Sequence, residues 1–221
     1  TSESAGSLQL CSYRCCSSRC LLDNTVLSDD LDFRSTTAFV DAPAGVPFDV
    51  SVAGPASVDT TGALYRESGV ILESNKTYIV VASGTIGSGT YNPATPFSFS
   101  VYEMGRENAD NPSEVDVLVL HGSTDAPTVD VAETGVGAGT IVDNISYGEF
   151  QGYLSLAPAA YQLTIQDSSG SNDLFTYDAD VTALAGNAIT ILASGFLDPT
   201  QNNGGEGFWL VCSHGCWRSN D

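Results

Sequence analysis

The densest group of side chains that could do chemistry begins at His121 and continues with Asp125 and Asp130. A nearby carboxylate can orient an imidazole, so this group could hold a metal ion or supply a base. In the alternative, structural interpretation, His121 bonds to the turn that it precedes, and Asp125 accepts backbone N–H groups before Ala126 and Pro127. We favour the structural interpretation, because a turn that defines a fold needs such residues without any catalysis.

Acidic side chains gather in three other places. These are Asp29, Asp30 and Asp32, then Asp110 and Glu114, then Asp178 and Asp180. Calcium is held by about six to eight oxygen atoms, and the chain lacks the regular Asp-x-Asp-x-Asp-Gly loop. A solvated acidic surface is the simpler interpretation. We therefore predict no resident cofactor, with calcium as the one candidate ion.

Two other side-chain patterns point to carbohydrate. Asn75 and Asn144 begin Asn-x-Ser/Thr sequons and are candidate glycosylation sites. Exposed rings could instead form a platform that binds a sugar, although alternating strands place most rings in a core. The rings available for such a platform are Tyr91, Tyr147, Tyr153, Tyr177 and Trp209.

The elements that must position these residues have the periodicity of strands. Apolar and polar residues alternate at 97–102 and 161–165, as in half-buried antiparallel strands. Further strands are predicted at 115–120, 128–131, 174–177 and 208–211. No window sustains a helical pattern beyond a short turn near 181–184. Short strands with frequent turns predict an all-β chain of two immunoglobulin-like Greek-key β-sandwiches.

The chain repeats itself with a period of about 110 residues, the size of one small domain. Residues 31–50 return as 145–163, and 78–84 return as 188–195. The polar segment 105–113 has the composition of a linker. We therefore predict a first module at 1–104, this linker, and a second module at 114–221.

Composition excludes several function classes. Twenty-seven acidic and seven basic residues give a formal net charge of −20, which repels nucleic acid and anionic lipid. No apolar run is long enough to span a membrane. The start of the chain resembles a mature end left after removal of a signal peptide, so we expect an extracellular protein, secreted or on the cell surface.

The segment 121–131, His-Gly-Ser-Thr-Asp-Ala-Pro-Thr-Val-Asp-Val, is followed by Tyr147-Gly148, a Tyr-Leu-Ser-Leu strand and a Pro-Ala turn. This pattern resembles the domain of unknown function 4397. The resemblance covers roughly 114–211, and again about 22–102, where the opening His-x-x-x-Asp-Ala-Pro motif is missing. It implies secreted or surface-anchored β-sandwich domains, often in tandem, with no established activity and no catalytic residues to carry over.

All six cysteines lie in two terminal clusters: Cys11, Cys15, Cys16 and Cys20, then Cys212 and Cys216. In an exported protein the first interpretation is a disulfide framework, within or between molecules. A second interpretation is a metal site formed by cysteine thiolates with His214, although the spacing of these residues matches no common zinc pattern. Both clusters stand where the repeat should continue. A one-nucleotide shift of a compatible coding sequence turns the first cluster into Val-His-Thr-Ala, the missing motif, and the second into Gly-Leu-Phe-Ala-Ala-Thr-Ala, a plausible final strand. The third interpretation is therefore that residues at about 8–21 and 209–221 are out of frame.

These observations favour a non-enzymatic structural or adhesion protein. Sandwich sheets leave edge strands, so self-association, or attachment to a cell surface, through edges or termini is expected. Head-to-tail contacts of this kind would build a filament or a surface layer. The alternative from another class is an extracellular module that binds carbohydrate or calcium. A hydrolase centred on His121 is a third hypothesis.

Overall fold

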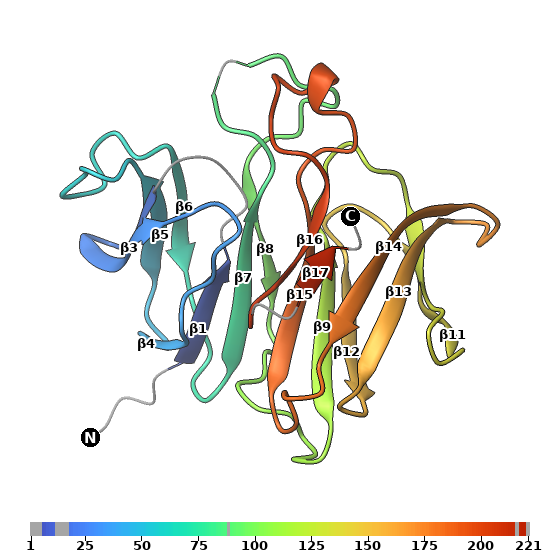
Figure 1. Cartoon of the computed structure of the whole chain (residues 1–221). Coiled ribbons are helices and arrows are strands. Elements are labelled where there is room, and N and C mark those ends of the chain that lie inside the picture. Colours follow the sequence, from blue (N-terminus) through green and yellow to red (C-terminus); the bar gives the residue numbers. More distant parts are fainter. Residues whose placement is uncertain (1–5, 12–17, 88, 215–216, 220–221) are drawn as a thin grey trace. The chain divides into compact units, whose positions relative to one another are not determined.

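The computed structural model describes residues 6–11, 18–87, 89–214 and 217–219. The fold is all-β, and two compact units account for it (Figure 1). Unit 1 consists of the described residues up to 87 together with 95–106, and unit 2 consists of 89–94 and the described residues from 107 onward. The boundary after Arg106 lies inside the segment predicted as a linker.

Unit 1 is built from two sheets. Its strands are β1 (Gly6–Cys11), β2 (Ser18–Leu22), β3 (Thr25–Leu31), β4 (Val40–Ala42), β5 (Phe48–Ala53), β6 (Tyr65–Val70), β7 (Thr77–Ser83) and β8 (Ser98–Tyr102). One sheet has the order β4-β1-β7-β8 and the other the order β3-β2-β5-β6. The pairs are antiparallel except β1 with β7, which is parallel.

Unit 2 is also built from two sheets. Its strands are β9 (Val115–His121), β10 (Val129–Glu133), β11 (Gly139–Ile145), β12 (Phe150–Leu156), β13 (Ala160–Asp167), β14 (Asp173–Asp180), β15 (Ala188–Ser194), β16 (Trp209–Cys212) and β17 (Trp217–Ser219). The sheet orders are β12-β9-β15-β16 and β11-β10-β13-β14-β17. A three-residue 3-10 turn, η1 (Pro199–Gln201), lies between β15 and β16.

The two units share one topology. Adding eight to each strand number of unit 1 reproduces both sheet orders of unit 2, apart from the extra strand β17. The parallel pair of β1 with β7 likewise corresponds to the parallel pair of β9 with β15. The duplication detected in the sequence is therefore present in the three-dimensional structure, strand by strand.

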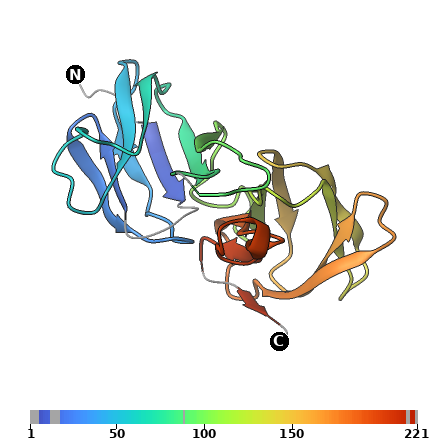
Figure 2. The ribbon, with the colours of Figure 1, turned by 90° about the horizontal axis from the view of Figure 1, so that it is seen from above.

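Each core lies between the two sheets of its unit, and Figure 2 shows these layers from above. In unit 1, Val50 of β5 and Val80 of β7 belong to one buried cluster. In unit 2, Leu163 of β13 and Leu210 of β16 likewise belong to one buried cluster. Alternation explains the pairing of layers, because every second side chain of a strand faces the opposite sheet.

The all-β prediction is confirmed, while the immunoglobulin-like Greek-key assignment stays a prediction. The predicted strands at 97–102, 115–120, 161–165 and 174–177 all coincide with observed strands. Near 181–184 the chain makes a single turn, with the Leu184 N–H bonded to the Val181 carbonyl at 3.0 Å. No helix in the described ranges is long and apolar enough to cross a bilayer.

Candidate functional site

His121 ends β9 as a buried side chain that is 2% exposed. Its Nε2 lies 3.0 Å from the carbonyl oxygen of Pro127, which assigns the ring proton to Nε2 as the donor. Nδ1 is then an acceptor, and it has no hydrogen-bond partner. Burial lowers the pKa of His121, against the opposing effect of the Pro127 carbonyl. The ring is therefore neutral at pH 7 and holds the turn that follows β9.

Asp125 binds a loop far along the chain. Its carboxylate accepts the N–H groups of Leu197 and Asp198, each at 2.8 Å, and the Asn202 side-chain amide at 2.9 Å. Asn202 is itself fully buried. Asp125 thus fastens the turn after β9 to the β15–β16 loop. The expected role of satisfying backbone donors is observed, but the donors belong to another loop.

Asp130 lies on β10 and is 5% exposed. Its Oδ1 accepts the Asn144 N–H at 2.7 Å, which fixes Asn144 in the left-handed backbone region at φ 53°. In the described residues, this hydrogen-bond partner of Asp130 is shared with neither His121 nor Asp125. In the part of the chain that the structure describes, no three or more His, Cys, Asp or Glu side chains gather as a metal site.

Glu133, at the end of β10, is the carboxylate that sequence reasoning missed. It is 2% exposed and accepts the N–H groups of Gly135, Val136, Gly137 and Ala138 at 2.8 to 3.1 Å. Burial tends to raise the pKa of Glu133, but these bonds outweigh it and hold the pKa below its ordinary value. The glycine-rich segment 134–139 was the available signal, because successive exposed N–H groups form an anion nest.

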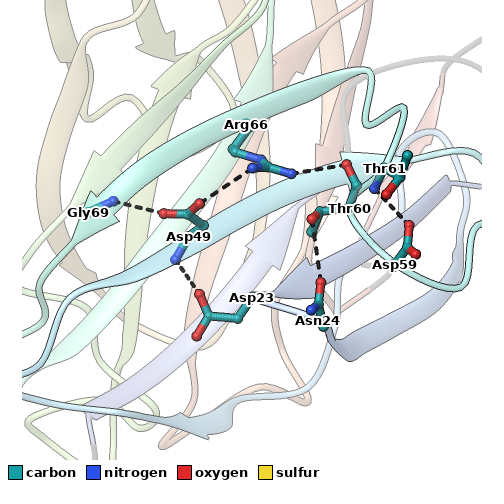
Figure 3. A network of polar contacts seen from close by, with 8 residues as sticks. All are labelled: Asp23, Asn24, Asp49, Asp59, Thr60, Thr61, Arg66 and Gly69. Carbon is teal, nitrogen blue, oxygen red and sulfur yellow. Dashed lines mark hydrogen bonds and ion pairs between the residues drawn. The ribbon is translucent and has the colours of Figure 1, made fainter.

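A polar network ties β6 to its neighbours in unit 1 (Figure 3). The Asp49 carboxylate accepts the Gly69 N–H at 3.1 Å and lies 3.8 Å from the Arg66 guanidinium. Arg66 also donates to the Thr60 carbonyl at 3.0 Å, and the Asp49 N–H donates to Asp23 at 2.8 Å. The network fixes the outer face of the sheet and contains no arrangement of reacting groups.

The acidic groups considered for calcium have structural partners. Arg19 donates to both carboxylate oxygens of Asp29, at 2.8 and 2.7 Å. Asp178 accepts the Gln162 side-chain amide at 3.5 Å. The side chain of Asp30 lies outside the described residues.

The cysteines divide into two groups. Cys20 on β2 is a free, buried thiol, so the structure contradicts its place among the disulfide candidates. Burial raises the pKa of Cys20 to about 12, which suppresses the reactive thiolate. Cys212 is disulfide-bonded. The side chains of the remaining four candidates lie outside the described residues: Cys11, Cys15, Cys16 and Cys216.

Both sequon asparagines, Asn75 and Asn144, are exposed at positive φ. The rings considered as a sugar platform occupy different environments. Tyr177 is a core residue at 5% exposure and meets Trp209 edge-on at 5.9 Å, whereas Tyr91 stacks on Phe196 at 6.1 Å. Glycosylation and sugar binding stay predictions.

Comparison with known proteins identifies one domain. Residues 115–203 match the Domain of unknown function (DUF4397). This match covers most of unit 2. No curated protein matches the chain.

One solved structure that the chain resembles is CBMbc (family CBM26) from Eubacterium rectale Amy13K, in complex with maltoheptaose. The identity is 8%, the TM-score is 0.26, and the alignment covers 87% of this chain and 94% of that one. A TM-score this low does not establish a shared fold, so no function is transferred from it.

Proposed function

We propose that this is a non-enzymatic extracellular structural protein whose copies associate through sheet edges, β8 of one copy pairing with β16 of the next. Sheet edges carry N–H and C=O groups that can pair with another chain, so proteins that stay apart protect their edges. Charged side chains, register breaks and short length are the usual protection. The edge strands of this protein differ in how much of this protection they have.

The comparison among edge strands supports this choice. In the described part of the chain, β3, β4, β6, β11 and β17 each contain a charged residue. Strand β12 has a register break where it pairs with β9. Strands β8 and β16 contain no charged residue. Neither has a register break, because every residue pairs in regular succession with β7 or β15. The two strands that lack both a charge and a register break, although β16 is only four residues long, occupy the same position in the shared topology.

The composition of β8 suits strand addition. Its sequence, Ser-Phe-Ser-Val-Tyr, is rich in aromatic and β-branched residues. Val101 is 47% exposed, which is high for an apolar residue in a strand. A second strand placed against this edge would cover apolar surface and pair backbone groups at once.

Pairing β8 with β16 joins unlike surfaces of two copies. Such a head-to-tail contact does not use a two-fold axis, and unless the rotation closes a ring it continues as a filament. The formal charge of −20 opposes lateral clumping while leaving the uncharged edges available. A fibre or surface layer is the assembly that these features favour.

The test is the assembly state of the full chain, measured by light scattering and electron microscopy over a range of protein concentrations. Ser98→Asp adds a charge at the exposed start of β8 and is expected to weaken association about tenfold or more. Ser168→Asp is the matched control, since it adds the same charge at an exposed position between β13 and β14.

Wild type and Ser168→Asp should form the same linear assemblies, and Ser98→Asp should remain dispersed. Dispersed monomers in all three samples would overturn the proposal. Equal assembly of all three would show that β8 is not the contact.

A further inference from the structure

Unit 1 contains a cavity of about 320 Å³ between its two sheets. The lining is apolar except for one carboxylate: Phe48, Val50, Glu67, Val70, Leu72, Val80, Phe99 and Val101. Small-molecule sites in proteins are commonly a few hundred Å³, mostly apolar, with few polar groups. The two apolar cavities found in the core of unit 2 are about 30 and 40 Å³, large enough for little more than one water molecule.

The shared topology explains why this region is hollow in unit 1 and filled at the corresponding place in unit 2. Glu67 pairs with Val50 on β5, and at the corresponding place in unit 2 Tyr177 pairs with Leu163. The Tyr177 ring is buried in the core, where it meets Trp209 edge-on. Ser98 stands in unit 1 at the position of Trp209. Unit 1 therefore lacks both rings that fill this region of unit 2.

Glu67 gives the cavity its one ionisable group. One of its oxygens accepts the Tyr65 hydroxyl at 2.6 Å, and the other has no hydrogen-bond partner in the described part of the chain. No lysine or arginine pairs with Glu67 there, whereas Arg66 on the opposite face pairs with Asp49. A carboxylate facing apolar walls favours a positively charged or hydrogen-donating partner.

Tyr65 is held in place beside this carboxylate. Its ring lies 4.8 Å from Phe97 and 5.2 Å from Phe99, measured between centroids. These contacts restrict the hydroxyl and, through it, the bonded oxygen of Glu67. The wall of the cavity therefore presents a positioned negative charge, and preorganised charges lose less affinity to ordering.

We infer that the unit 1 cavity binds a small molecule with an apolar body and a single amine head, the body lying among Val50, Val80 and Phe99 and the head at Glu67. The net charge of −20 raises the local concentration of cations and repels carboxylates. Phe99 and Val101 of β8 also line this cavity, so a strand paired with β8 would cover part of its rim, and binding is therefore measured on protein that stays dispersed.

The experiment compares three probes with one chain length: hexylamine, hexanol and hexanoate. Binding is followed by calorimetry and by the thermal shift of the dispersed Ser98→Asp protein, so that assembly does not contribute. Hexylamine should bind at one site per chain and raise Tm in a saturable way. Hexanol should bind at least fivefold more weakly, and hexanoate should not bind.

Two variants of the cavity complete the test. Glu67→Gln keeps the shape and should weaken hexylamine about tenfold while leaving hexanol within twofold. Glu67→Tyr copies Tyr177, fills the cavity, and should abolish binding of both probes. The exposed position of Glu67 makes the glutamine variant compatible with folding.

Hexylamine that bound Glu67→Gln and the parent equally would overturn the inference, since adsorption to an acidic surface predicts that result. Hexanoate that bound as well as hexylamine would overturn it, as would the absence of saturable binding by every probe. None of these results bears on whether β8 mediates assembly, so the two proposals fail independently.

Discussion

Glu133 illustrates how buried carboxylates are used in this protein: its negative charge is neutralised by backbone N–H groups of one loop. Asp125 and Asp130 also accept backbone N–H groups from segments distant in sequence. Carboxylates bonded in this way stabilise the fold, and removing one leaves several donors without a partner.

Glu133→Gln should lower the stability of unit 2 by about 1.5 to 3 kcal/mol at pH 7, because the loop loses its charged acceptor. The pKa of Glu133 is lowered on folding, so its contribution is complete above the ordinary value of 4.5 and is lost as the pH falls through the folded value. Urea unfolding at pH 7 and at about pH 3 measures both effects.

Glu206→Gln makes the same chemical change at an exposed site and serves as the control. A difference between Glu133→Gln and wild type that stayed constant across the acid range would contradict this account of Glu133.

Asp125→Ala should release the β15–β16 loop, because the Leu197 and Asp198 N–H groups lose their acceptor. Hydrogen exchange at these two amides should quicken at least tenfold, while the central amides of β15 stay protected. Unchanged exchange at Leu197 and Asp198 would mean that Asp125 does not hold the loop.

At the residue scale, the sequence predicted the role of some residues and missed others for a physical reason. The His121 and Asp125 turn was predictable because turn chemistry is local. Glu133 was missed because a glutamate that ends a strand usually faces solvent, and its partners become visible only when the loop geometry is known. Glu67 was missed because the cavity beside it depends on how side chains of β5, β7 and β8 pack around it in the folded unit.

At the scale of elements, the strand pattern of the sequence identified six strands, because one face of each sheet is buried: β8, β9, β10, β13, β14 and β16. Strands β1 and β2 were not predicted, since the cysteine-rich segment has no regular alternation there. Their pairing with β7 and β5 comes from the shared topology of the units. Pairing between distant strands is a tertiary effect that local periodicity does not determine.

Buried side chains on the inward face of β11 should contribute most to the free energy that holds this strand in place. Val142→Ala removes a side chain that is 1% exposed and should cost about 2 to 3 kcal/mol through lost burial and the cavity left behind. Val136→Ala is the same substitution in the adjoining loop at 67% exposure, and should cost less than about 0.5 kcal/mol. Equal costs in denaturant titrations would contradict the assigned burial.

At the scale of the whole molecule, the charge of −20 affects stability at every position. Screening shortens the reach of this repulsion from about 30 Å at 0.01 M salt to about 3 Å at 1 M. Between these limits Tm should rise by about 5 °C in sodium chloride, a salt that changes apolar burial little. A Tm independent of salt would show that ion pairs such as Arg19 with Asp29 offset the repulsion.

The central claim, that copies join through β8 and β16, is tested most directly by hydrogen exchange measured at low and high protein concentration. Pairing predicts that amides of Ser98–Tyr102 and Trp209–Cys212 become protected as concentration rises, while those of the charged edges β3 and β6 do not change. Exchange in β8 and β16 that is the same at every concentration would contradict the claim.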